Sequence, residues 1–143
     1  FETRFFPGGL TYSGHPLAMA AIVATLDAMA EQGMVDNARQ VGQEVLAPGL
    51  QHLANRHELI GEVRGLGLFW AIEFVSDRQR KTPLTAAVVA RMKAAFQARG
   101  LLTFTVENRL HVVPPCIVTP AEASEALTIL DDVIGDFSRR GAP

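Results

Sequence analysis

The stretch that decides the fold is Gly8-Gly9-Leu10-Thr11-Tyr12-Ser13-Gly14-His15-Pro16, which stands directly before a long apolar segment. Its glycines let the backbone pass close to a ligand because they lack a Cβ, and Pro16 suits the first position of a helix. Free N–H groups ahead of that helix, together with the three hydroxyl side chains that begin at Thr11, can hold an anion. A plain turn with Ser13 or His15 as the helix cap explains the same spacing equally well.

Helical periodicity follows this stretch. Residues 16–32 are apolar on nearly every side, which predicts a helix that is buried on most sides and ends at Gly33. A second helix is predicted to begin near Met34 and to continue past Asn55. Because proline removes a helical hydrogen bond and clashes with the preceding turn, Pro48 predicts a kink, or two helices that meet near Ala47.

The next apolar segment reads as β structure. Residues 62–75 are apolar on both faces, which predicts a strand that is covered from both sides, and Gly65 and Gly67 mark a bend or bulge within it. Apolar residues on one face then predict a helix over residues 85–99, which stops at Gly100.

The last third of the chain predicts a hairpin and a final helix. Residues 101–106 and 109–113 read as two strands across the short polar connection Glu107-Asn108. Thr119-Pro120-Ala121-Glu122 is the capping-box pattern, and it predicts a helix that runs to about Phe137. From residue 62 onward, the order of strand, helix, strand, strand, helix predicts an α+β fold in which a small antiparallel or mixed sheet carries helices on one face.

Composition narrows the classes of function. The 143 residues are 48% hydrophobic with a net charge of −2, so the chain is globular and offers no basic face to nucleic acid. The apolar segment 17–30 falls short of the about 20 residues that a membrane span needs, so no membrane partner is expected. Cys116 is the only cysteine, which excludes an intramolecular disulfide and fits a cytoplasmic protein. We expect this thiol to be buried as a small hydrophobe.

Other candidate chemistry is weak on spacing alone. His52 and His57 lie five residues apart, which is off the spacing that places two metal ligands on one helix face, so both are expected on the surface and no metal site is predicted. Lys81 and Lys93 lie in a charged loop and on an amphipathic helix, where a solvated structural role is expected.

Three motifs together resemble the class III aminotransferases, the ω-aminotransferase family. The glycine stretch is similar to the pyridoxal-phosphate segment of that family, and residues 61–68 are similar to the strand entry of its small C-terminal domain. Residues 112–115, Val-Val-Pro-Pro, followed by Thr119, resemble the region before its last helix. The motifs occur in the order and spacing of the family, so the resemblance covers nearly all of the chain.

The resemblance implies an architecture. The chain would be the C-terminal portion of a fold-type I transferase that depends on pyridoxal 5'-phosphate (PLP). Residues 1–57 would form the end of the large PLP-binding domain and its linking helices, and residues 58–143 the small α+β domain. The family forms a Schiff base on a lysine upstream of the glycine stretch. Since the chain starts at Phe1 without that lysine, we expect it to hold no catalytic residue and to be inactive alone.

The resemblance also implies a cofactor, substrates and a partner. Thr11 would bond the PLP phosphate through its hydroxyl, with the N–H of Leu10 nearby. In the family this contact crosses a dimer interface, so a homodimer with shared active sites is expected. The substrates would be an amine or ω-amino acid and a 2-oxo acid, with PLP as the electron sink for amino-group transfer.

Substrate contacts follow from the same alignment with less support. Tyr12 would help to shape the substrate pocket, and His15 would orient the start of the helix. Relatives often place a carboxylate-binding arginine where this chain has Phe104. Arg109 could take the place of that arginine, because its guanidinium can bind a carboxylate through two parallel hydrogen bonds. A position on the solvent face of the hairpin, without a substrate contact, fits the sequence around Arg109 equally well. Arg64 is expected in a structural ion pair.

Two other functions stay open at this stage. One is a non-catalytic α+β module that binds a small anion or a protein partner. The other is a different fold-type I PLP enzyme, such as a decarboxylase or mutase, because fold does not fix reaction type.

Overall fold

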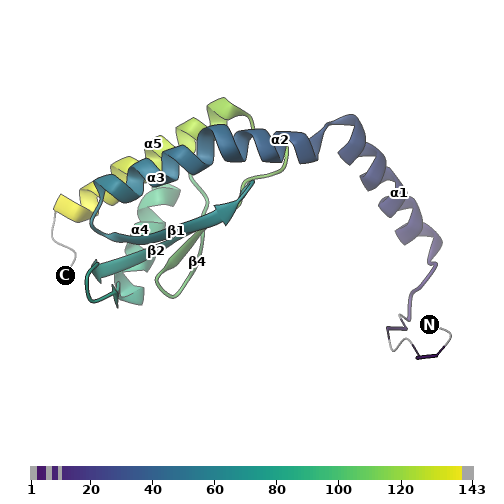
Figure 1. Cartoon of the computed structure of the whole chain (residues 1–143), viewed down its shortest axis with the longest axis horizontal. Helices are drawn as coiled ribbons and strands as arrows, with labels where there is room; N and C mark the ends of the chain where they lie inside the picture. The colour runs from purple at the N-terminus through teal and green to yellow at the C-terminus, as the bar shows by residue number, and fades with distance from the viewer. Residues whose placement is uncertain (1–2, 6–7, 10, 140–143) are drawn as a thin grey trace. The chain divides into compact units, whose positions relative to one another are not determined.

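The computed structural model describes residues 3–5, 8–9 and 11–139, and Leu10 therefore lies outside the described residues. The chain divides into two compact units between Gly33 and Met34 (Figure 1). The predicted domain boundary between residues 57 and 58 stays a prediction.

The first unit holds the glycine turn and helix α1 (Pro16–Glu31). The helix starts as predicted, since Pro16 takes the first position and Nδ1 of His15 accepts a hydrogen bond from the Ala18 N–H at 3.4 Å. Gly33 has a φ of 58° just beyond the helix, which a glycine adopts without strain. The predicted burial of α1 is wrong for this chain, because no residue of the helix is buried. Its large apolar side chains are between 37% and 74% exposed: Leu17, Met19, Ile22, Val23, Leu26 and Met29.

The second unit begins with one long helical stretch. Helix α2 (Met34–Val41) passes into a π-helical turn, η1 (Gly42–Leu46), and then into α3 (Ala47–Arg56). Pro48 lies in the first turn of α3, where its missing N–H costs no hydrogen bond within that helix. The predicted junction near Ala47 is confirmed, and the wider π turn accommodates the proline.

The sheet of the second unit is antiparallel throughout. It contains β1 (Ile60–Leu66), β2 (Phe69–Asp77), β5 (Arg109–Val112) and β4 (Phe104–Val106) in that spatial order, and β3 (Thr82–Pro83) pairs with β2. The expected single kinked strand over residues 62–75 is wrong. The chain reverses at Gly67, whose φ is 56°, so that Leu66 pairs with Phe69 in a hairpin. The predicted hairpin across Glu107-Asn108 is confirmed.

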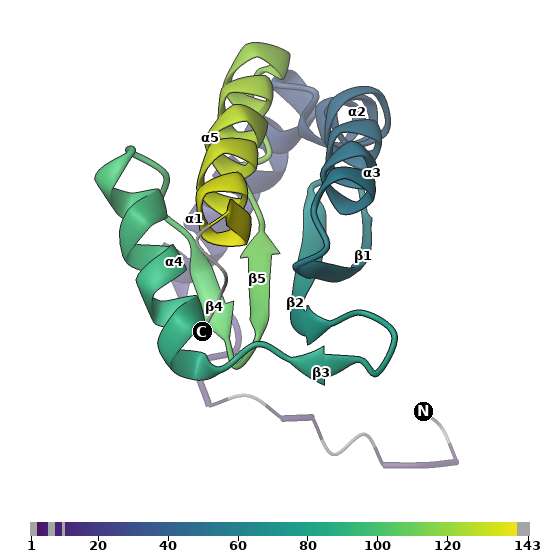
Figure 2. The ribbon, with the colours of Figure 1, turned by 90° about the vertical axis from the view of Figure 1, so that its left-hand side faces the viewer.

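Three helical segments lie side by side over one face of this sheet and form a single layer (Figure 2). They are the α2–α3 stretch, α5 (Pro120–Arg139) and α4 (Ala86–Ala98). The predicted capping box is present at the start of α5, and a cap that was not predicted starts α4. The Thr85 hydroxyl accepts from the Val88 N–H, and the Glu122 carboxylate accepts from the Thr119 N–H at 2.8 Å, which completes the capping box. The core between sheet and helices is apolar, and its largest fully buried side chains include Phe74, Phe96, Leu50, Ile72 and Met92.

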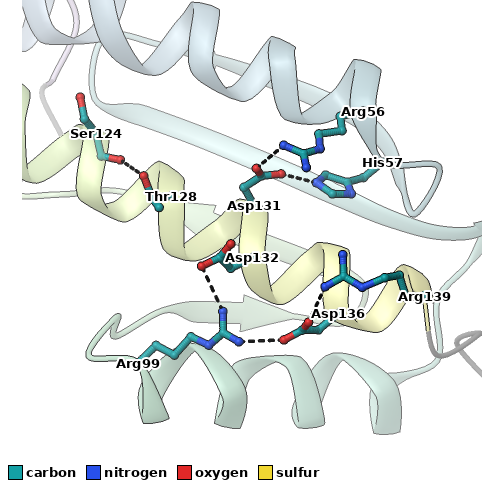
Figure 3. Close-up of polar contacts among 9 residues, drawn as sticks. All are labelled: Arg56, His57, Arg99, Ser124, Thr128, Asp131, Asp132, Asp136 and Arg139. Carbon is teal, nitrogen blue, oxygen red and sulfur yellow. Dashed lines mark hydrogen bonds and ion pairs between the residues drawn. The ribbon is translucent and has the colours of Figure 1, made fainter.

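Polar side chains tie the helices together around the core (Figure 3). Nε2 of His57 lies 2.5 Å from Oδ1 of Asp131 on α5, and Arg56 contacts the other oxygen of the same carboxylate at 2.7 Å. The prediction that His57 lies on the surface is therefore wrong, since this side chain is 6% exposed at the end of α3. Arg99 in turn joins the end of α4 to Asp132 and Asp136 of α5.

Candidate functional site

The glycine stretch forms a tight turn before α1. Residues 11–14 are turn residues, the His15 N–H donates to the Tyr12 carbonyl at 3.2 Å, and Gly14 has a φ of 74°. The hydroxyl-bearing side chain of Thr11 is exposed, and Tyr12 is 76% exposed with its ring edge against His15.

This turn fits the chemistry of a phosphate group. The exposed Thr11 hydroxyl and the positive end of the α1 dipole are both suited to an anion. A Cβ added to Gly9 or Gly14 would meet no atom within 4 Å, so the space beside the turn is open within the described chain. The predicted contact from the N–H of Leu10 falls outside the described residues.

The face of the sheet away from the helices is open. Paired residues on antiparallel strands point to the same face. The pairs Leu66–Phe69, Ala71–His111 and His111–Phe104 therefore share this open face.

An aromatic row crosses the open face. His111 on β5 lies between two phenylalanines, with ring centroids 6.4 Å from Phe69 on β2 and 5.4 Å from Phe104 on β4. Each phenylalanine is 63% exposed. We call Phe69, His111 and Phe104 the aromatic row. Of these residues, only Phe104 was singled out from the sequence, and the alternation of side chains along paired strands is the signal that marks all three.

The candidate arginine Arg109 is held by acidic neighbours. Its guanidinium contacts Oε2 of Glu107 at 3.0 Å, and its backbone pairs with Glu73 across the sheet. Arg109 therefore lies on the open face in an ion pair.

Arg64 lies in the predicted structural ion pair, which is confirmed. Its guanidinium contacts Glu62 at 3.1 Å and Glu73 at 3.0 Å. The hydrogen bond from Arg64 is the main cause that lowers the pKa of Glu73, and the same bond raises the pKa of Arg64. Both arginines of the open face are thus paired with glutamates.

A cavity of about 650 Å³ opens where β4 and β5 separate. The pairing of these strands ends at Phe104 and His111, and beyond it residues 101–103 and 113–115 carry no strand pairing. Both segments line the cavity, α5 contributes Ala123, Ala126 and Leu130, and the aromatic row also lines it. We call it the β4–β5 cavity. The prediction of strand over residues 101–106 is therefore wrong for residues 101–103, and that departure creates the cavity.

The lining of the β4–β5 cavity is almost entirely apolar. Its side chains with polar atoms are those of Thr103, His111 and Glu122 among the described residues. Oγ1 of Thr103 is buried and has no hydrogen-bond partner. A cavity with these properties accepts an apolar group and is unfavourable for an unpaired charge.

A second cavity of about 530 Å³ lies between α2, the β1–β2 turn and residues 113–116. Cys116 lines it and is exposed, so the expectation that this thiol is buried is wrong. The Asn37 amide donates to the carbonyls of Cys116 and Val118, which fixes the segment by its backbone and leaves the thiol outside the core.

The described part of the chain offers neither a metal site nor a single membrane-spanning helix. No group of three or more His, Cys, Asp or Glu side chains there could hold a metal ion. No single described helix is long and apolar enough to cross a membrane, and α1 combined with the helical stretch 34–56 reaches those limits by length and composition alone.

Comparisons with known proteins agree on one family. Residues 3–134 match the profile described as Aminotransferase class-III. The chain is 32% identical over 132 residues to ethanolamine-phosphate phospho-lyase homolog 1 of Caenorhabditis elegans, which covers 90% of this chain and 28% of that protein. It is also 35% identical over 128 residues to taurine–pyruvate aminotransferase of Rhodobacter capsulatus. That match covers 85% of this chain and 28% of that protein.

Solved structures agree on the fold. The structure of taurine:2-oxoglutarate aminotransferase from Bifidobacterium kashiwanohense, in complex with PLP and glutamate, matches with a TM-score of 0.86 at 29% identity. The match covers 99% of this chain and 32% of that chain. The chain therefore spans less than a third of the length of the relatives that it matches.

Proposed function

The chain belongs to the class III aminotransferase family, and on this premise we propose that it forms part of a PLP-dependent transaminase. The reaction would move an amino group from an amine or ω-amino acid to a 2-oxo acid. When bound, PLP supplies the electron sink for this chemistry. The residues of this chain anchor the cofactor and shape the substrate site.

Thr11 carries the proposal. Its exposed hydroxyl stands at the glycine turn immediately before the N-terminus of α1, where an anion is stabilised by the helix dipole. In the proposed role, Thr11 donates a hydrogen bond to the PLP phosphate, the Leu10 N–H lies beside it, and Tyr12 borders the substrate. Arg109 is a second proposed substrate contact, and its ion pair with Glu107 would have to open for it to bind a carboxylate.

The proposal includes a homodimer with shared active sites. The side chains of α1 are apolar on nearly every side and none is buried within this chain, so the helix needs a covering surface. A partner subunit that covers α1 would also place its own cofactor at Thr11. The lysine that forms the Schiff base is proposed to lie outside residues 1–143, because Lys81 lies in the turn between β2 and β3 and Lys93 lies on α4, where solvated structural roles are expected.

The experiment is an amino-transfer assay on the complete polypeptide. The protein is loaded with PLP and incubated with an amine donor and pyruvate, and alanine is measured by chromatography. Formation of alanine that requires both PLP and the donor supports the proposal. Absence of alanine from a panel of amines and ω-amino acids contradicts it and leaves a non-catalytic binding module as the better reading.

A second candidate reaction is favoured by one relative. The match to a protein named as an ethanolamine-phosphate phospho-lyase homolog suggests a PLP-dependent lyase. The two reactions differ in product, because the lyase would release inorganic phosphate from ethanolamine phosphate without a 2-oxo acid. A phosphate assay on samples that contain ethanolamine phosphate and no 2-oxo acid therefore separates them.

A further inference from the structure

We propose that the β4–β5 cavity receives an apolar or aromatic substituent of the amine substrate, so that the enzyme prefers such amines over ω-amino acids with an anionic end. This inference rests on the proposed function, because Arg109, a proposed substrate contact, lies on the same strand and the same sheet face as His111, which lines the cavity. Its chemical content comes from the cavity itself.

The cavity has the size and the opening of a ligand site. Its volume of about 650 Å³ falls within the range of small-molecule sites. It opens at the end of the β4–β5 ladder, where Leu102 is exposed and where residues 101–103 leave the sheet. A ring can therefore enter between two chain segments without breaking a strand pair.

The aromatic row supplies a matching surface at the cavity. Phe69 and Phe104 flank His111 at centroid distances of 6.4 Å and 5.4 Å, and all three line the cavity. Aromatic rings favour edge-to-face or offset contact with another ring at such distances. A phenyl group placed there would cover the exposed rings of two phenylalanines. This removes apolar surface from water and therefore favours binding of the phenyl group.

The charged residues at and near the cavity disfavour a substrate with an anionic end. Glu122 lines the cavity, and the described lining includes no lysine or arginine. The arginines on the same sheet face, Arg64 and Arg109, already contact Glu62, Glu73 and Glu107. A carboxylate or sulfonate that entered the cavity would lose water and gain no cation in return.

The test uses two donors that differ at one end. The donors 3-phenylpropylamine and 4-aminobutyrate share a primary amine on a chain of methylene groups, and they end in a phenyl ring and a carboxylate. The complete polypeptide loaded with PLP should show a kcat/KM that is at least about tenfold higher for the phenyl donor. A higher kcat/KM for 4-aminobutyrate would overturn the proposal.

Two arginine substitutions on one strand sharpen the test. Phe104→Arg removes a ring of the aromatic row and places a cation at the cavity, so the preference for the phenyl donor should fall about tenfold. Val106→Arg is the matched control, because Val106 lies on the same strand and the same face but is not among the cavity residues. It should leave the preference unchanged. Equal effects of the two substitutions would contradict the assignment.

A binding measurement separates this inference from the proposed function. In the PLP-free protein, titration with 3-phenylpropylamine should shift the NMR methyl signals of Leu101 and Leu130, which line the cavity, and Phe104→Arg should abolish the shifts. If the methyl signals shift but the protein transfers no amino group, the cavity binds the proposed class of ligand and the transaminase assignment is wrong. Amino transfer from 4-aminobutyrate without any shifts would uphold the transaminase and overturn the inference.

Discussion

The two units of the chain differ in how far their apolar side chains are buried. In residues 34–139 the sheet and helices bury one shared core, in which Phe74, Phe96 and Met92 are fully inaccessible. In the first unit, α1 is just as rich in apolar residues but buries none of them. The first pattern belongs to a unit that supplies its own stability. The second is an exposed apolar surface, for which the proposed function assigns a partner subunit.

The largest expected effect tests this contrast directly. Phe74→Ala would leave a cavity in the core of the second unit and should lower the free energy of unfolding by about 3–5 kcal/mol. Leu26→Ala removes a similarly large apolar side chain from α1, where it is 60% exposed, and should leave unfolding of the isolated chain unchanged. Chemical denaturation of the 143-residue chain measures both. A comparable loss from Leu26→Ala would show that α1 has a core of its own.

The next effect concerns the end of α3. The Arg78 guanidinium donates to the carbonyls of Ala54, His57 and Ile60 at distances of 2.6–3.0 Å. Arg78→Ala leaves these acceptors without their donor and should cost about 2 kcal/mol of unfolding free energy. Arg80→Ala is the control, because Arg80 makes an exposed ion pair with Asp77, and it should cost less than about 1 kcal/mol. Equal losses would exclude a special role for Arg78.

A pair of threonine substitutions should have effects of opposite sign. Thr103→Val replaces a buried hydroxyl that lacks a partner, so it should leave stability unchanged or raise it by about 1 kcal/mol. Thr85→Val removes the N-cap of α4 and should lower stability by about 1 kcal/mol. Thermal unfolding of both variants measures the difference. Destabilisation by Thr103→Val would reveal a hydrogen bond to that hydroxyl.

The smallest expected effect is on acid stability. Since the hydrogen bond from Arg64 holds the pKa of Glu73 below its ordinary value, the folded state binds a proton less readily at this group than the unfolded state does. The resulting stabilisation is present above the ordinary glutamate pKa and is lost as the pH falls through the lowered value. Glu73→Gln should therefore flatten the decline of unfolding free energy at acid pH. An unchanged decline would contradict the assignment.

Local signals predicted most of the helices, and the departures have physical causes. The capping box at Thr119 and the proline at position 16 act within one turn, so the sequence alone specifies these helix starts. The β1–β2 hairpin was missed because Gly67 reverses the chain inside a continuous apolar run. The burial of His57 depends on Asp131, a residue far along the sequence on α5.

The candidate site also has a part that the local sequence predicts and a part that depends on tertiary packing. The turn at Thr11 was predictable because glycines, hydroxyls and a helix start are neighbours in sequence. The β4–β5 cavity was not, because it forms where residues 101–103 fail to continue a pairing that their composition favours. The exposure of α1 also could not be read from its pattern, since burial depends on what packs against a helix.

The measurement that tests the account most directly is cofactor retention by the complete polypeptide. The protein is saturated with PLP and dialysed, and the remaining cofactor is measured by its absorption in wild type, Thr11→Ala and Thr25→Ala. Thr25 is an exposed threonine whose hydroxyl donates to the Ala21 carbonyl within α1, so its removal controls for loss of a hydroxyl in this unit. The account predicts that wild type and Thr25→Ala keep PLP, while Thr11→Ala binds it about tenfold more weakly. Equal retention by all three proteins would contradict the role of Thr11, and no retention by wild type would contradict the assignment of the cofactor.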